Sequence, residues 1–239
     1  MGPILATDRL ETTAPYPGPE PMAGSQPRDD GPSAWDGLAR RGMDVVGAAL
    51  LLLITAPLSL VAAVWIRVDS PGPALLRQQR IGLGRRAFTL YKFRTMRVGA
   101  DDAAHRALIA AELRGEDTRS GGSTKLDGDP RITRAGRFLR KTSCDELPQL
   151  WNVLRGDMSL VGPRPCLPWE ADMFPARYAE RFTVRPGLTG LWQVRGRSSL
   201  GTREMLELDL EYVRTRRLGT DLWIVMATLP ALLRGNGAR

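Results

Sequence analysis

One long apolar run near the N-terminus stands out in the hydrophobic pattern of the chain. From Val45 to Ile66 there are 22 consecutive residues without a charged side chain. At about 1.5 Å per residue, a helix of this length covers the roughly 30 Å hydrocarbon core of a bilayer. A buried helix of a soluble protein is a poor alternative at this length, so the pattern predicts a membrane-embedded helix.

A proline inside this run and basic residues on both sides of it bear on its topology. Pro57 lies just past the middle, where it removes a backbone donor and bends or breaks a helix. Arg40 and Arg41 precede the run and Arg67 follows it, and basic residues favour the cytoplasmic side of a membrane. A helix that bends at Pro57 and returns to the same face satisfies both flanks. The flanks modestly favour such a re-entrant helix, but a kinked spanning helix stays open.

Downstream of this run the pattern predicts a helix-rich α+β domain. Residues 75–81 and 87–96 read as two strands joined by a Gly-containing turn. Pro148 is tolerated only in the first turn of a helix, so a helix should begin near Asp145. Further helices are expected at 101–114, 202–217 and 222–233, the last too short to span a membrane.

These elements divide the chain into three parts. Residues 1–36 carry seven prolines and few large apolar residues, which predicts a disordered tail. Residues 37–67 form the predicted re-entrant membrane helix. Residues 68–239 form the predicted cytoplasmic catalytic domain, so the expected protein is monotopic.

The charge balance points to anionic partners. Lys and Arg total 34 against 26 acids, a net charge of +8. Eight of the basic residues lie between Arg67 and Arg97, next to the apolar run, where they favour membrane lipids over nucleic acid. With two cysteines and a single histidine, His105, the composition disfavours a zinc site and favours a reducing cytoplasmic setting. His105 itself is interpreted as an ordinary helix surface residue.

The candidate chemistry is an adjacent acid pair, Asp145 and Glu146, preceded by arginines at every third position and by Lys141. Acids at a helix start can be simple caps, and this alternative has about even odds on the pair alone. Basic neighbours should keep Asp145 ionised, and an ionised carboxylate can attack phosphorus. Two carboxylates cannot approach a diphosphate without neutralisation, so this chemistry implies Mg²⁺ bound by Asp145 and Glu146.

At this point the segment 129–165, DPRITRAGRFLRKTSCDELPQLWNVLRGDMSLVGPRP, resembles the signature of the bacterial sugar transferases. These monotopic phosphoglycosyl transferases move a sugar-1-phosphate from a UDP-sugar to undecaprenyl phosphate at the cytoplasmic face of the inner membrane. The resemblance runs in order from about residue 38 to the C-terminus. Its other matches are Arg41 and Asp44, DSPGP at 69–73, KFRTM at 92–96 and RPGLTGLWQVRGR at 185–197.

The resemblance implies a role for each matching residue. Asp145 is the expected nucleophile, which takes the phosphosugar and releases UMP before undecaprenyl phosphate attacks in a ping-pong second step. Glu146 is expected at the Mg²⁺ site. The residues expected to bind substrate or phosphate are Lys92, Arg94, Arg140, Lys141, Arg164, Arg185 and, more weakly, Asp209.

Some points stay open at the level of sequence. Where the family usually has Ser-Pro at the membrane break, this chain has Ala56-Pro57, which puts the angle of the break in doubt. A non-catalytic basic adaptor that binds anionic lipids is the alternative function. The sugar, the glycoconjugate pathway and the oligomeric state, homo-oligomers included, are not readable from the residues.

Overall fold

The computed structural model describes residues 34–97, 103–116, 118, 131–196 and 199–233. Most of the predicted tail, 1–36, therefore lies outside the described residues, and helix α1 begins within it at Ala34. The fold is helix-rich α+β, as predicted. Its helices are α1 (Ala34–Asp69), α2 (Ala103–Arg114), α3 (Arg134–Thr142), α4 (Gln149–Arg155), α5 (Pro168–Met173), α6 (Leu191–Arg195), α7 (Thr202–Thr215) and α8 (Leu218–Leu233), with 3-10 turns η1 (Leu83–Arg85), η2 (Cys144–Glu146) and η3 (Ala176–Thr183).

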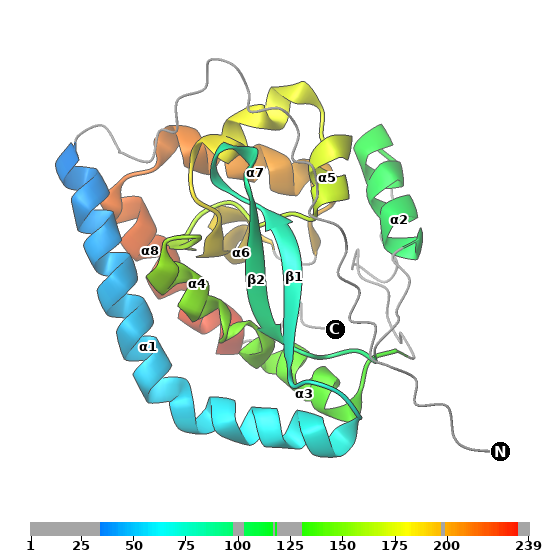
Figure 1. The fold of residues 1–239 in the computed structure, drawn as a ribbon. Coiled ribbons are helices and arrows are strands. Elements are labelled where there is room, and N and C mark those ends of the chain that lie inside the picture. The colour runs from blue at the N-terminus through cyan, green and yellow to red at the C-terminus, as the bar shows by residue number, and fades with distance from the viewer. Residues whose placement is uncertain (1–33, 98–102, 117, 119–130, 197–198, 234–239) are drawn as a thin grey trace.

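Two small sheets organise the domain. The hairpin of β1 (Leu75–Ile81) and β2 (Ala87–Phe93) is antiparallel, with Leu75 opposite Phe93. The short strands β3 (Ser159–Val161) and β4 (Gly187–Thr189) pair in parallel. Figure 1 shows the hairpin crossing the middle of the molecule, with helices around it. The predicted second strand ends at Phe93 rather than at Met96, because Met96 instead bridges to Ile132 ahead of α3.

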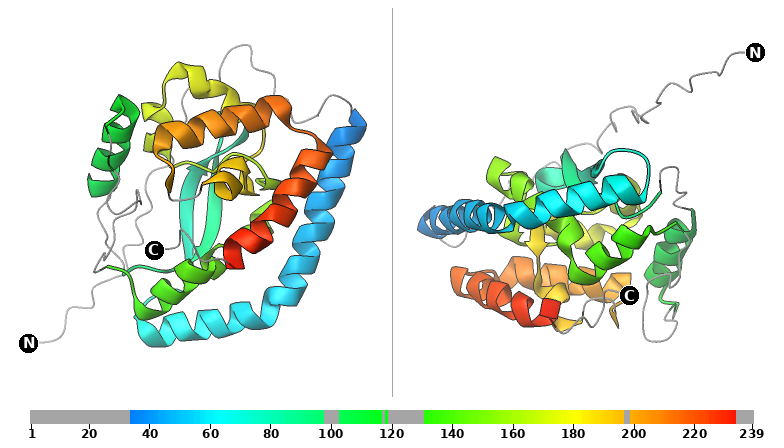
Figure 2. Two further views of the ribbon diagram at one scale, coloured as in Figure 1. Left: turned by 180° about the vertical axis from the view of Figure 1, so that it is seen from behind. Right: turned by 90° about the horizontal axis from the view of Figure 1, so that it is seen from below.

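Helix α1 is a single helix of 36 residues that bends part-way along its length (Figures 1 and 2). It contains Pro57, and sharp bends in helices usually lie at proline. Among the described residues it is the one helix long and apolar enough to cross a membrane. Only 11% of its most apolar stretch is buried, which separates it from a core helix. The re-entrant path in a bilayer stays a prediction.

The first arm of α1 is fixed to α4 and β3 by two polar side chains. Arg41 donates to the carbonyl oxygens of Val153 at 2.7 Å and Leu154 at 2.8 Å, which caps the C-terminal end of α4. Asp44, 3% exposed, accepts from the backbone N–H of Leu160 at 2.7 Å. The two residues that match the family at the start of the helix therefore attach α1 to the domain.

The other end of α1 is fixed to α3 and to the segment after β2. Asp69 accepts from the backbone N–H of Ala135, in the first turn of α3, at 2.9 Å. Arg94, 4% exposed, donates to the carbonyl oxygens of Ser70, at 2.7 Å, and Pro71. Its guanidinium is used to cap the end of α1, so we assign Arg94 a structural role in place of the expected phosphate contact.

Candidate active site

The acid pair lies at a sharp reversal between α3 and α4. Helix α3 ends at Ser143, whose φ of 57° is left-handed, and η2 follows at once with Asp145 and Glu146. Helix α4 begins only at Gln149, after Pro148. Helical structure does begin beside Asp145, as predicted, but as the 3-10 turn that carries the acids. The α-helix itself begins four residues later, directly after Pro148.

Charged side chains from four separate segments converge on this reversal. Burial lowers the pKa of Lys92, on β2, to about 8, and the charges of Arg80, Arg140 and Arg164 lower it too, whereas Asp145 raises it. Such mutual effects require these groups to lie close together in space. We call this set the charge cluster: Arg80, Lys92, Arg140, Asp145, Glu146 and Arg164.

The environment of Asp145 raises its pKa to about 6. The largest cause is burial and the next is the neighbouring charge of Glu146, while Lys92 and Arg140 act in the opposite direction. Burial and the second carboxylate thus outweigh the basic neighbours in setting this pKa. At neutral pH a carboxyl with a pKa of about 6 is still about 90% ionised, as a nucleophile requires.

Arg140 is the arginine of the α3 stripe that turns towards the cluster. Its Nε donates to the hydroxyl oxygen of Thr95 at 3.0 Å, which orients the guanidinium. Arg134, Arg137 and Lys141 are exposed on the outside of α3. Basic residues that look equivalent in the sequence therefore differ in the fold. Of these four, Arg140 contributes to the charge cluster, and Arg134, Arg137 and Lys141 face solvent.

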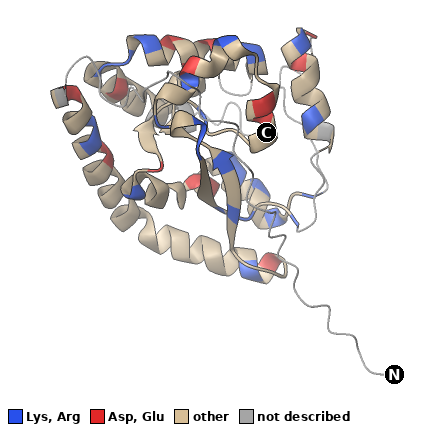
Figure 3. Ribbon diagram, turned by 45° about the horizontal axis from the view of Figure 1, so that its top comes forward, with Lys and Arg blue, Asp and Glu red and all other residues tan. Residues whose placement is uncertain are grey.

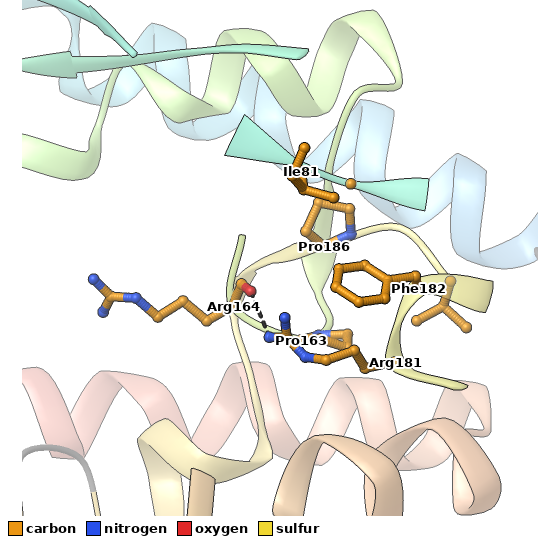
Figure 4. Close-up of a pocket in the computed structure, with 8 residues that line it drawn as sticks. Ile81, Pro163, Arg164, Arg181, Phe182 and Pro186 are labelled. Carbon is orange, nitrogen blue, oxygen red and sulfur yellow. Dashed lines mark hydrogen bonds between the residues drawn. The ribbon is translucent and has the colours of Figure 1, made fainter. Parts of the chain in front are cut away.

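Arg164 lies in the loop 162–165 and is exposed. Its guanidinium lies 5.7 Å from the centre of the Trp192 ring, within range of a cation–π contact. A hollow of about 170 Å³, counting the part open to solvent, lies beside the backbone of this loop. Figure 4 shows the Arg164 side chain directed away from Phe182, Pro186 and Ile81, which line that hollow.

Two expected substrate contacts have other partners. Arg185 donates from Nε to the carbonyl oxygen of Gly156 at 2.8 Å, beyond the C-terminal end of α4 and so at the opposite end of that helix from the acid pair. Asp209 is 1% exposed and ion-paired with Arg181 at 2.7 Å. These contacts are structural ones, and the predicted substrate contacts of Arg185 and Asp209 stay predictions.

His105 lies on helix α2 with its side chain 44% exposed, as expected of a surface residue, but its ring also has specific partners. Its Nε2 lies 3.2 Å from a carboxylate oxygen of Glu170, and its ring meets Trp169 edge-on at 5.4 Å. Glu170 lies 3.7 Å from Arg80 as well. The histidine therefore docks α2 onto α5, close to an arginine of the charge cluster.

The acid pair fits a divalent cation held mainly by substrate. Asp145 and Glu146 are adjacent, and the charge of Glu146 raises the pKa of Asp145, a repulsion that a cation would relieve. No group of three or more His, Cys, Asp or Glu side chains that could hold a metal occurs within the described part of the chain. Two carboxylates plus phosphate oxygens is a donor set that suits Mg²⁺.

Comparison with known proteins agrees with this geometry. Residues 35–235 match the family described as bacterial sugar transferase. The chain belongs to this family. It is 47% identical over 209 residues to the UDP-glucose:undecaprenyl-phosphate glucose-1-phosphate transferase of Caulobacter vibrioides, covering 84% of this chain and 72% of that protein. It is 37% identical over 202 residues to the exopolysaccharide production protein ExoY of Rhizobium meliloti, covering 84% and 88%.

Some other relatives in the family are much longer. The chain is 41% identical over 203 residues to the galactosyl transferase CpsE of Streptococcus agalactiae, covering 84% of this chain but only 44% of CpsE. The predictions of a bacterial sugar transferase and of a transferase enzyme are confirmed. The roles of individual residues stay predictions that the geometry refines.

Sequence reasoning missed one residue that positions part of the charge cluster. Asn152, fully buried on α4, donates to the carbonyl oxygen of Thr89 at 2.7 Å and accepts from the N–H of Tyr91 at 3.1 Å. It therefore sets the position of β2, and so of Lys92, relative to the helix that follows the acid pair. The available signal was an amide side chain among the apolar residues of LPQLWNVL.

Proposed function

We propose that the chain transfers a sugar-1-phosphate from a UDP-sugar to undecaprenyl phosphate and releases UMP. The observation that carries this proposal is the charge cluster, in which a mostly ionised carboxylate is surrounded by cations from β1, β2, α3 and the loop 162–165. The relatives support it, because several are named as transferases of this kind, acting with glucose, galactose or N-acetylgalactosamine.

In the first step an oxygen of Asp145 attacks the phosphorus that carries the sugar. A bond forms between Asp145 and that phosphorus, and the bond to the bridging oxygen breaks, so UMP leaves with the electron pair. Lys92, Arg140 and Arg164 are the cations suited to hold the diphosphate and to stabilise the charge that develops on the leaving phosphate.

In the second step a phosphate oxygen of undecaprenyl phosphate attacks the same phosphorus. The Asp145–phosphorus bond breaks, the carboxylate is restored, and the product is the sugar diphosphate of the lipid. Because UMP leaves before the lipid reacts, the scheme is ping-pong.

Mg²⁺ belongs to this proposal, with Asp145 and Glu146 as its protein ligands. When bound, it supplies charge neutralisation to the diphosphate. The protein residues then bind, orient and attack the substrate around it.

The placement we propose is the inner membrane, with the catalytic domain on the cytoplasmic face, where the transfer would begin assembly of a polysaccharide or other glycoconjugate. The apolar, largely exposed α1 supports embedding in lipid, and its bend supports a re-entrant path. Figure 3 shows the middle of α1 without charged residues, which lie towards its two ends and on neighbouring elements, an arrangement that suits contact with membrane lipids. Labelling of single cysteines placed before and after α1 tests this, because accessibility from opposite faces would contradict re-entry.

The test of function is UMP release from a panel of UDP-sugars with Mg²⁺, using the full chain in membranes. UDP-glucose is the first donor to try, since the relative at 47% identity is named for it. We expect Asp145→Asn to abolish UMP release. It should also abolish the covalent protein intermediate that forms when the sugar phosphate of the donor is radiolabelled. Asp172→Asn, a change to a carboxylate that is 48% exposed on α5, is the matched control and should keep the wild-type rate.

The alternative of a non-catalytic basic adaptor makes the opposite prediction. An adaptor would bind anionic vesicles but release no UMP from any donor. If Asp145→Asn releases UMP at the wild-type rate, the chain is still a transferase but Asp145 is not its nucleophile. Release that survives chelation by EDTA would reject the role of Mg²⁺.

A further inference from the structure

A buried ion pair lies directly behind the loop that carries Arg164. Arg181, from η3, and Asp209, from α7, are 3% and 1% exposed, and their closest nitrogen and oxygen are 2.7 Å apart. Taking both charges out of water costs several kcal/mol per ion, and apolar residues often fill such a place at no loss of stability. A role beyond stability is therefore worth seeking for this pair.

The pair binds both backbone polar groups of a single residue. Arg181 donates from a terminal nitrogen to the carbonyl oxygen of Arg164 at 2.8 Å, the dashed line in Figure 4. The carboxylate of Asp209 accepts a hydrogen bond from the backbone of Arg164 on the other side. One acceptor and one donor of the same residue are thus held by opposite charges, which fixes the orientation of its peptide groups.

The neighbouring backbone groups of the loop are held as well. Arg80 donates to the carbonyl oxygen of Pro165 at 3.2 Å, and the N–H of Gly187 donates to that of Pro163 at 2.8 Å. With its backbone fixed, Arg164 extends its side chain away from the ion pair (Figure 4). There its guanidinium lies over Trp192 and its charge acts on Lys92.

We infer that Arg181 and Asp209 are positioning residues that aim Arg164 at the phosphates of the nucleotide. The inference rests on the proposed function, in which Arg164 binds the donor. Binding geometry is sensitive to small displacements, and a shift of about 1 Å can cost about 100-fold in rate. The pair is therefore expected to act on donor affinity and not only on folding.

The experiment measures UMP affinity by calorimetry on the full chain in detergent micelles, with the unfolding midpoint measured on the same samples. UMP is the product common to every UDP-sugar, so the unidentified sugar does not matter. Asp209→Asn is expected to weaken UMP binding about tenfold or more, and to lower kcat/KM for the donor by at least the same factor.

Two further variants separate positioning from stability. Asp221→Asn is the matched control, because Asp221 is 2% exposed and paired with Arg40 at 3.1 Å on the α1–α8 side of the fold. It should alter the unfolding midpoint but not the affinity for UMP. The double variant Arg181→Met with Asp209→Leu removes both buried charges, so it should regain stability over the single variant while its affinity stays weak.

Each outcome has a definite reading. Wild-type UMP affinity in the double variant would overturn the inference, even if Asp209→Asn fails to fold. Arg164→Ala is measured alongside: if it weakens UMP binding while the pair variants do not, the inference alone fails. If Arg164→Ala binds UMP as wild type does, Arg164 is not a nucleotide contact and both the inference and that part of the proposed function fail.

Discussion

Asn152 offers the sharpest test of how the fold positions the charge cluster. It is fully buried and makes hydrogen bonds to the carbonyl oxygen of Thr89, the N–H of Tyr91 and the carboxylate of Asp157. Asn152→Ala removes all three and leaves a backbone acceptor and a backbone donor of β2 without these bonds. The hairpin then loses its polar attachment to α4.

The expected loss of folding stability follows from the two backbone groups of β2 that lose their hydrogen-bond partner. Each buried polar group left unsatisfied costs about 1–3 kcal/mol, so the two backbone groups together give a loss of about 2–6 kcal/mol. Because a domain of this size has only about 5–15 kcal/mol of net stability, the loss should be plain in a urea titration. UMP release per folded molecule should also fall, since Lys92 on β2 would no longer be fixed relative to Asp145.

The assay is urea unfolding followed by tryptophan fluorescence in detergent micelles, paired with UMP release. Gln79→Ala is the control on the same hairpin, because the Gln79 amide makes a single exposed bond to the Thr89 hydroxyl at 3.3 Å. It should change stability by less than about 0.5 kcal/mol. An Asn152→Ala protein with the wild-type unfolding midpoint and wild-type UMP release would refute the reasoning.

Three further predictions concern other parts of the fold. Gly136→Ala puts a Cβ 2.0 Å from the carbonyl oxygen of Thr95, so thermal unfolding should show a loss of several kcal/mol; an unchanged midpoint would contradict the close approach. Arg94→Leu leaves the carbonyl oxygens at the end of α1 without their donor and should cost about 2–5 kcal/mol in the same assay, whereas a purely phosphate-binding arginine would cost nothing. Burial raises the pKa of Asp221 to about 6 from 3.8, so the folded state holds that proton more tightly and stability from this group rises as pH falls from about 7 to 4. The gain is about 3 kcal/mol, and Asp221→Asn should remove it from a plot of unfolding free energy against pH.

Local signals account for what the sequence could predict. Threonine is a residue type that caps helices, and Thr133 accepts from the N–H of Gly136 at the start of α3, a contact between residues only three apart. The strand 75–81 and the start of α7 at Thr202 were likewise marked by alternation and turn residues close by. The length and composition of the apolar run were enough to predict the helix α1.

Partners far apart in the chain account for what the sequence could not predict. Arg94, Arg185 and Asp209 are basic or acidic residues in family motifs, and nothing local distinguishes a substrate contact from a buried structural one. Their partners are known only once the chain is folded: Asp209 lies 28 residues from Arg181, and Arg185 lies 29 from Gly156. The raised pKa of Asp145 could not be predicted from the sequence either. Its largest cause is burial, which depends on the tertiary fold.

The bent helix and the acid pair are linked more closely than a membrane anchor requires. Arg41 on the first arm of α1 caps α4, and Asp69 at its far end accepts from the first turn of α3. The acid pair lies in the turn between those two helices, and the two ends of α1 hold the ends of α3 and α4 that lie away from that turn. The bend near the middle of α1 is what allows a single helix to reach both. Helix α1, which contains Pro57, therefore holds both helices that flank Asp145 as well as being the candidate membrane helix.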